Sequence, residues 1–216
     1  MSSAIKAIYG VALSPFSMRI EMMLMAKGSN LRLTPPEDGV HSAAYRALAP
    51  IGKIPAMQLA DGRVFGESEV IAAFIEETLD GPALMPAEAA DRAEARLAAR
   101  TADIYVMNRM LPLFKQLDPA TRDQQVVDAA IAEARDGLVW LDQQVNAARP
   151  GYDAPYAAAA VVPIIFYVTR FFPMFSQSQV LADMPSLAAW YERLIAAQPG
   201  AQVVAAMDSA LREAGL

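Results

Sequence analysis

A serine placed directly before a proline is the first feature of this chain that could do chemistry. Ser14 precedes Pro15, an order that favours a helix with the serine as its N-cap and the proline in its first turn. A hydroxyl at that position can donate to a thiolate, which the positive end of the helix also stabilises. A free thiol has a pKa of about 8.5, and lowering it by about 2 units needs roughly 2.7 kcal/mol, which one charge-assisted hydrogen bond and a helix end can supply. Ser14 is therefore our first candidate, Ser17 is the second, and an N-cap serine without a ligand is the alternative.

The stretch 51–69, IGKIPAMQLADGRVFGESE, holds the second group of candidate residues. Ile54 stands before Pro55 and must be extended, because proline disfavours the helical conformation in the residue before it. An extended residue beside a fixed proline can offer its backbone N–H and C=O to a peptide-like ligand by strand addition. Ser68 would be the first residue of a helix, where backbone N–H groups bind carboxylates well. The alternative is a β-hairpin that leads into a helix and binds nothing.

The elements expected to position these residues form a small α/β arrangement. Two apolar runs split by Asp61-Gly62 predict a β-hairpin, and Gly28 predicts the end of the first helix. The expected order begins with a strand at Ala4–Tyr9, a helix at Met18–Lys27 and a strand at Leu31–Thr34. A loop that contains His41 follows, then the hairpin at Ala56–Leu59 and Val64–Phe65, and a helix at Val70–Leu79.

After a linker at Asp80–Ala87 the pattern is almost entirely helical. The expected helices are Ala89–Leu113, Asp123–Asn146, Ala157–Val168, Pro185–Ala197 and Ala201–Ala214. The sequence therefore predicts an α/β plus all-α fold, with domains at 1–80 and 88–216. The apolar run Ala157–Val168 is too short to cross a bilayer and predicts a buried helix.

Composition excludes several classes of function. The chain has 216 residues, is 55% hydrophobic and carries a net charge of −6, which supports a sizeable core and argues against nucleic-acid binding. It has no cysteine and a single histidine, so disulfides, thiolate metal sites and histidine-based metal sites are not expected. The N-terminus lacks the pattern of a signal peptide, and we expect a cytoplasmic protein without membrane contact.

Three motifs together make the chain resemble the glutathione transferase family over its whole length. They are Ser-Pro-Phe-Ser at 14–17, Gly-Lys-Ile-Pro at 52–55 and Glu-Ser at 67–68, within a β-α-β, β-β-α order followed by helices. The resemblance implies a thioredoxin-like glutathione-binding domain, an all-helical substrate-binding domain and a cis bond before Pro55. It also implies that Ser14 activates the sulfur of glutathione, as in serine-type members.

The resemblance further implies which residues bind each of the three parts of glutathione. The backbone of Ile54 would pair with the cysteinyl part, and Glu67 and Ser68 would hold the γ-glutamyl part. His41 would hold the glycine carboxylate. Ser42 stands where the family often has a lysine, so Lys53 would supply the positive charge instead.

The chain departs from the family at two places. It has Ala49-Pro50 where many members have Asn-Pro, so a local turn-stabilising hydrogen bond is missing. Pro155 and Ala158 stand where the family usually has a Ser/Thr-x-x-Asp capping box, which leaves Asp153 as a possible N-cap of the buried helix.

The implied reaction adds the glutathione thiolate to a small apolar electrophile. A glutathione-dependent isomerase or lyase and a non-catalytic glutathione- or ligand-binding module are the alternatives. The second-substrate pocket is expected between the domains, and its candidate residues are Tyr105, Asn108, Phe166 and Arg170, with Met107, Leu111, Phe114 and Phe171 around them. The long helix that carries Arg92, Arg96, Arg100 and Asp103 lines a two-fold interface in the family, so we expect a homodimer.

Overall fold

The computed structural model describes residues 5–177 and 179–216, which divide into two compact units. The first unit extends to Met85 and includes Gln198–Leu216, and the second is Pro86–Ala197. The boundary between them falls inside the linker expected at Asp80–Ala87. The domain ranges predicted from the sequence differ from these units in one element, the last helix, which lies in the first unit.

The first unit is built on a four-stranded sheet with the order β2-β1-β3-β4. The pair β1 and β2 is parallel, and the pairs β1 and β3, and β3 and β4, are antiparallel. Its elements are β1 Ile5–Tyr9, α1 Pro15–Ala26, β2 Leu33–Thr34, α2 Ala43–Leu48, β3 Ala56–Leu59, β4 Val64–Phe65, α3 Ser68–Thr78 and α9 Gly200–Glu213. This is the predicted α/β order with α2 and α9 added.

Local signals explain most of these boundaries. Ser14 is the N-cap of α1, and Pro15 opens the helix, as expected. Gly28 follows the end of α1 with a φ of 70°, a conformation that glycine adopts without steric cost. The hairpin β3–β4 has the predicted bounds, and the Asp61 carboxylate accepts the backbone N–H of Arg63 across its turn.

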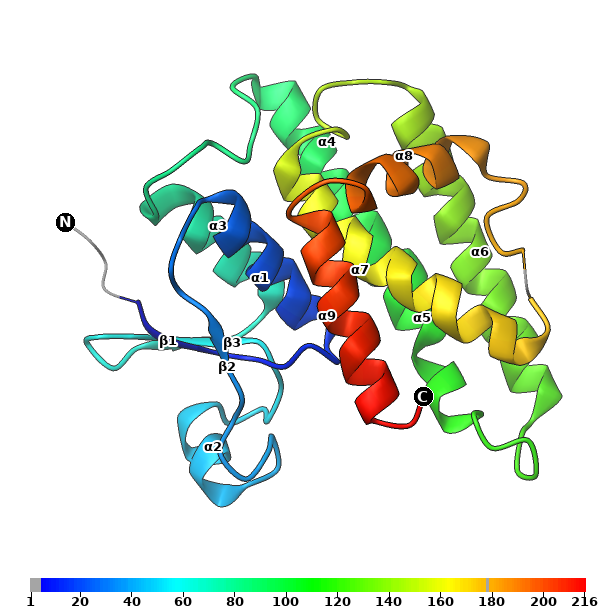
Figure 1. Cartoon of the computed structure of the whole chain (residues 1–216), viewed down its shortest axis with the longest axis horizontal. Helices are drawn as coiled ribbons and strands as arrows, with labels where there is room; N and C mark the ends of the chain where they lie inside the picture. The colour runs from blue at the N-terminus through cyan, green and yellow to red at the C-terminus, as the bar shows by residue number, and fades with distance from the viewer. Residues whose placement is uncertain (1–4, 178) are drawn as a thin grey trace. The chain divides into compact units, whose positions relative to one another are not determined.

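Helices α1 and α3 supply much of the first unit's core. Ile20, Met23 and Leu24 of α1, like Ile71 and Ile75 of α3, are fully buried. Figure 1 shows α9 lying beside α1, and the two helices are in contact. The last helix of the chain therefore packs on the first one, although its place in the sequence follows the helical region.

The short helix α2 occupies the region expected to be a loop. The Ser42 hydroxyl caps it by accepting the backbone N–H of Tyr45 at 3.1 Å, and the Tyr45 side chain is buried. A six-residue helix is too short for a clear apolar period, so the sequence pattern missed it.

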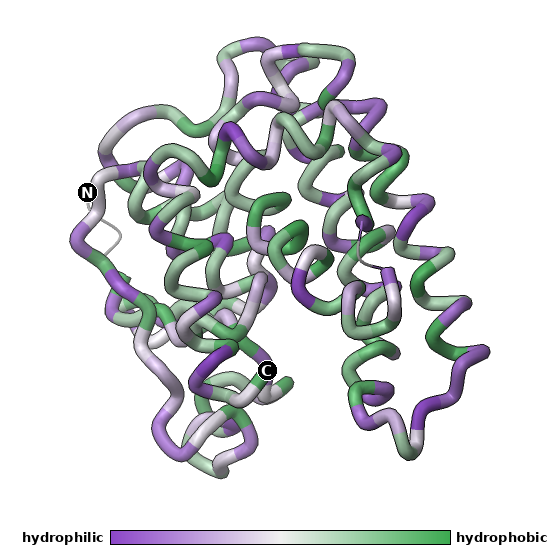
Figure 2. Tube along the Cα trace, turned by 45° about the vertical axis from the view of Figure 1, so that its right-hand side comes forward, coloured by the Kyte–Doolittle hydropathy of each residue, from purple (hydrophilic) through white to green (hydrophobic). Residues whose placement is uncertain are grey.

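The second unit is helical throughout its regular structure. Its elements are α4 Ala89–Arg100, η1 Thr101–Met107, α5 Asn108–Met110, η2 Leu111–Lys115, α6 Gln124–Asn146, α7 Pro155–Phe171, η3 Phe172–Phe175 and α8 Pro185–Ile195. Figure 2 shows hydrophobic and hydrophilic residues alternating along these helices, as expected where one face of a helix is buried.

The long helix predicted at Ala89–Leu113 is present, but its middle is a π-helix. The α-helical turns of α4 widen at Thr101, and the segment η1 keeps this geometry to Met107. Gly137 of α6 lies against it: a Cβ added there would be 2.3 Å from the carbonyl oxygen of Tyr105. The Gln144 side chain donates to the Thr101 hydroxyl at 3.0 Å, so α6 contacts the wide turns closely.

Helix α7 is the buried centre of the second unit, as predicted. With η3 it forms a segment of 21 residues, long and apolar enough to cross a membrane by length and composition, so the expectation that it is too short was wrong. In the structure 78% of its most apolar window is buried, which makes it a core helix.

The expectation that Asp153 caps α7 was also wrong. The N-cap residue is Ala154, and it makes no side-chain capping bond. The Asp153 carboxylate instead accepts the indole N–H of Trp190 at 3.0 Å and pairs with Arg193. Because both partners lie on α8, the carboxylate joins the start of α7 to a neighbouring helix.

Candidate functional site

Three of the predicted site segments meet beside the end of β1 and the start of β3, the two central strands of the first unit's sheet. Tyr9, the last residue of β1, pairs with Ala56, the first residue of β3. The chain before Ala56 therefore lies beside the end of β1, and β1 leads to the start of α1. The start of α3 joins them, because Arg19 of α1 contacts Ser68.

Ser14 has the geometry of a hydroxyl available to a ligand, whereas Ser17 does not. Ser14 Oγ accepts the backbone N–H of Ser17 at 3.2 Å, and no acceptor for its proton is found within residues 5–177 and 179–216. The Ser17 side chain is fully buried, and Gly10 lies so close that a Cβ there would be 2.8 Å from Ser17 Oγ. Ser14 is thus partly exposed, whereas the packing against Gly10 closes Ser17 off from a ligand.

The backbone of Ile54 is free at the start of β3. The Ile54–Pro55 bond is cis, as the resemblance implies, and no backbone hydrogen bond of Ile54 to another described residue is found. The neighbouring carbonyl of Lys53 accepts the Tyr45 hydroxyl at 2.7 Å, which fixes the chain on one side. Burial, and to a lesser extent Tyr9, raise the pKa of Tyr45, so its hydroxyl stays a donor at neutral pH.

The start of α3 combines an unusual backbone with a buried polar contact. Glu67 has a φ of 62° and a ψ of 116°, a conformation that non-glycine residues rarely adopt and that tends to occur at functional sites. Its side chain is exposed, while Ser68 is buried. Ser68 Oγ accepts a hydrogen bond from Arg19 Nη1 at 3.0 Å. No signal in the sequence pointed to Arg19 or to the backbone of Glu67.

His41 lies just before α2, beside a cation that the sequence analysis missed. Arg46 Nη2 is 3.4 Å from His41 Nδ1, because the first turn of α2 brings residue 46 close to residue 41. The Arg46 guanidinium also lies next to Gly52, where a Cβ would be 3.4 Å from Arg46 Nε. Lys53 follows Gly52 with an exposed side chain, so positive charge gathers around this loop.

Comparison with known proteins matches this site to one family. The model of the glutathione S-transferase N-terminal domain matches residues 13–78, which include Ser14, Ile54 and Ser68. Glutathione S-transferase U2 of Arabidopsis thaliana is 27% identical over 139 residues, 64% of this chain and 59% of that protein. The match thus spans about three fifths of the relative's length.

Residues 13–78 belong to the glutathione S-transferase N-terminal domain family.

Solved structures of glutathione transferases share its fold. Glutathione transferase F7 from Populus trichocarpa has a TM-score of 0.78 at 20% identity, covering 93% of this chain and 98% of that one. A glutathione transferase family member from Pseudomonas fluorescens Pf-5, solved with bound glutathione, has a TM-score of 0.75 at 24% identity, with coverage of 90% and 95%. The thioredoxin-like domain followed by helices is therefore the glutathione transferase fold, as the motifs implied.

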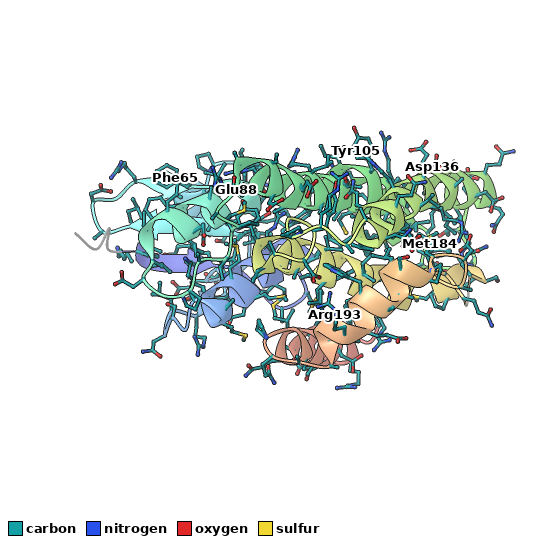
Figure 3. All side chains as sticks on the ribbon, turned by 90° about the horizontal axis from the view of Figure 1, so that it is seen from above. Phe65, Glu88, Tyr105, Asp136, Met184 and Arg193 are labelled. Atoms are coloured by element: carbon teal, nitrogen blue, oxygen red, sulfur yellow. The ribbon has the colours of Figure 1, made fainter. Side chains whose placement is uncertain are left out.

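The residues predicted to line a second-substrate pocket make separate sets of contacts in the structure. The Tyr105 ring packs edge-on against Trp140 at 5.4 Å and lines a hollow of about 350 Å³ with Arg109, Glu133, Asp136, Gly137 and Trp140. Figure 3 shows Tyr105 and Asp136 along the same side of the second unit.

Phe166 is buried on α7, and the Arg170 guanidinium lies over its ring at 5.0 Å. Asn108 is exposed. The second-substrate role of Tyr105, Asn108, Phe166 and Arg170 stays a prediction.

Proposed function

We propose that this family member is a serine-type glutathione transferase that adds the glutathione thiolate to a small apolar electrophile. The observation that carries the proposal is Ser14: its Oγ accepts the Ser17 N–H at 3.2 Å, which leaves the hydroxyl proton available to a ligand. The N-terminus of α1 adds positive potential at the same place. Both interactions favour the thiolate over the thiol, and the thiolate is the nucleophile.

The proposed contacts with the rest of glutathione follow the site's three segments. The free N–H and C=O of Ile54 pair with the cysteinyl backbone as an added strand. Glu67 and Ser68 bind the γ-glutamyl end, where the start of α3 favours a carboxylate. His41 and Lys53 bind the glycine carboxylate, and Arg46 adds charge next to His41. The protein thereby contributes a lowered thiol pKa and a fixed orientation of the sulfur.

The test is the thiolate absorbance of bound glutathione as a function of pH in the parent, Ser14→Ala and Ser17→Ala. The Ser14→Ala variant should keep its glutathione affinity within about threefold, because the hydroxyl meets only the sulfur. The pKa of the bound thiol should rise towards about 8.5. Turnover at neutral pH should fall by up to about tenfold for each pKa unit lost and should partly recover at higher pH. Ser17→Ala is the matched control and should change neither quantity.

A parent protein that binds glutathione without lowering its thiol pKa would contradict the transferase proposal and favour a binding module. Turnover of a chloro-aromatic electrophile with loss of free thiol supports a transferase. Product formation with glutathione recovered unchanged indicates an isomerase or lyase instead.

We also propose a homodimer, with the helical segment that begins at α4 in its interface. Two-fold dimers are the commonest closed assembly, and the exposed face of this segment carries Leu97 and Tyr105. A monomeric mass in light scattering at micromolar concentration would contradict this assembly.

A further inference from the structure

The buried guanidinium of Arg19 is the most unusual charged group in the first unit. Arg19 is only 1% exposed, although arginine is almost never fully buried unless it is paired. It lies in the second turn of α1 and makes two contacts with the start of α3. Nη1 donates to Ser68 Oγ at 3.0 Å, and Nη2 lies 3.2 Å from Glu69 Oε2.

This contact decides what the Ser68 hydroxyl can do. A serine hydroxyl has one proton to donate and lone pairs to accept with. Because Arg19 donates to Ser68 Oγ, an accepting position is already used, and the proton remains to be donated to a ligand. A hydrogen bond from a cation also polarises the hydroxyl, which makes it a stronger donor.

The same guanidinium places positive charge next to Ser68 and Glu69, in the first turn of α3. Glu69 lies 3.2 Å from it and offsets part of this charge, but the Glu69 side chain is 26% exposed and is partly screened by solvent. The Arg19 side chain lies in a region shielded from water, where charges interact more strongly. The backbone N–H groups at the start of α3 therefore act together with a buried cation.

We infer that Arg19 is a positioning residue, which orients the Ser68 hydroxyl as a donor and through that hydroxyl raises the affinity of the α3 N-terminus for the carboxylate of the γ-glutamyl group. This inference rests on the proposed glutathione-binding function. Arg19 acts through Ser68, whereas Ser14 acts on the sulfur. Because Arg19 lies in α1 and Ser14 is the N-cap of α1, one helix serves both the sulfur and the γ-glutamyl end of the ligand.

The test is a double-mutant cycle in which reduced glutathione is titrated by calorimetry. One change is Arg19→Met combined with Glu69→Gln, so that no unpaired carboxylate is left at the site, and Glu69→Gln alone is measured beside it. The other change is Ser68→Ala. With Ser68 present, removing Arg19 should weaken glutathione binding by about tenfold or more. In the Ser68→Ala background the same removal should cost at most about threefold, since residues in contact show such coupling.

Lys27→Met is the matched control, because Lys27 also joins α1 to α3 by a buried ion pair. Its Nζ lies 2.8 Å from Glu76 Oε2, and its side chain is 3% exposed. Lys27 has no contact with Ser68 among the described residues, so its removal should leave glutathione affinity within about threefold. Arg19→Lys keeps a buried cation but cannot form both contacts in the same fork geometry, and its glutathione affinity should lie between that of the parent and that of the combined Arg19→Met and Glu69→Gln variant.

Kinetics separates positioning from a general loss of structure. Removing Arg19 should raise KM for glutathione and leave kcat at saturating glutathione within about twofold, with the thiol pKa unchanged. Equal losses of affinity with and without Ser68, or an equal loss in Lys27→Met, would overturn the inference, while the proposed function stands. A parent protein that does not bind glutathione would overturn the proposed function itself.

Discussion

In the first unit the buried polar residues gather on α1 and at the start of α3, whereas in the second unit they lie around one irregular turn. Among residues 5–177 and 179–216, the buried polar residues of the first unit are Ser17, Arg19, Glu21, Lys27 and Ser68, and those of the second are Thr101, Asp103 and Gln144. In the first unit this set adjoins residues that remain open to a ligand, such as Ser14 and Glu67. In the second unit Thr101 binds Gln144 within the core, and Asp103 pairs with Arg100 one turn away.

The buried polar residues of the second unit lie in the π-helical segment η1 or contact it. The Thr101 hydroxyl donates to the Leu97 carbonyl at 2.8 Å and accepts from Gln144. Asp103, one of the buried residues, pairs with Arg100 at 3.5 Å. Polar groups used in this way hold two helices in a fixed register. We therefore expect substitutions at these helix contacts to change stability, and substitutions at the open groups of the first unit to change binding.

The largest expected effect is on the contact between α6 and the π segment. In Gly137→Ala the new Cβ would overlap the Tyr105 carbonyl, which is part of the backbone and cannot rotate away. The free energy of unfolding should fall by at least about 2 kcal/mol, although alanine favours a helix over glycine. Urea denaturation measures it, with Gly66→Ala as the control, because a Cβ at Gly66 meets nothing within 4 Å. Equal midpoints for the two variants would refute the close contact.

The next effect concerns ligand binding in the first unit. Glu67→Ala and Ser68→Ala should each weaken glutathione binding by roughly ten- to a hundredfold, since the loss of a charged hydrogen bond costs about 1.5–3 kcal/mol. Calorimetry measures the affinity. Ser209→Ala is the control, because the Ser209 hydroxyl donates to Glu213 within α9. Unchanged affinity in both variants would show that this pair does not hold the γ-glutamyl group.

A smaller effect is expected where α7 begins. Asp153→Ala removes the acceptor of the part-buried Trp190 N–H, and an unsatisfied donor of this kind costs about 1–2 kcal/mol. Unfolding monitored by tryptophan fluorescence should show this loss, while glutathione affinity stays the same. The control is Asp208→Ala, which removes a pair with the exposed Arg212 and should cost at most about 0.5 kcal/mol. Weaker glutathione binding in Asp153→Ala would contradict the expectation that helix contacts of the second unit affect stability alone.

The smallest effect is expected at Tyr45. Tyr45→Phe removes one hydrogen bond to the Lys53 carbonyl and should cost about 0.5–1.5 kcal/mol. Because burial raises the pKa of Tyr45 above 10.0, this stability is complete at neutral pH and is lost only as pH rises through the raised pKa. Unfolding of parent and variant at pH 7 and above pH 10.0 checks it. A difference that grows with pH would contradict the assignment of Tyr45 as the donor.

The sequence by itself determined the elements whose signals are local. Ser14 with Pro15 predicted the start of α1, Gly28 its end, and Asp61-Gly62 the hairpin with its observed bounds. Each signal acts within a few residues, through a fixed φ, a capping hydroxyl or a turn. The motifs at 14–17, 52–55 and 67–68 pointed to the family for the same reason, because they are short and contiguous.

The tertiary structure alone decided the contacts between distant residues. Arg19 and Ser68 are 49 positions apart, and no periodicity links a charged residue on one helix to the cap region of another. The positive φ of Glu67 and the π turns of η1 contradict local preferences and exist because neighbouring elements hold them. The packing of α9 on α1 likewise follows from apolar surface that only the folded first unit presents, since burial of such surface is non-directional and leaves no partner-specific mark in the sequence.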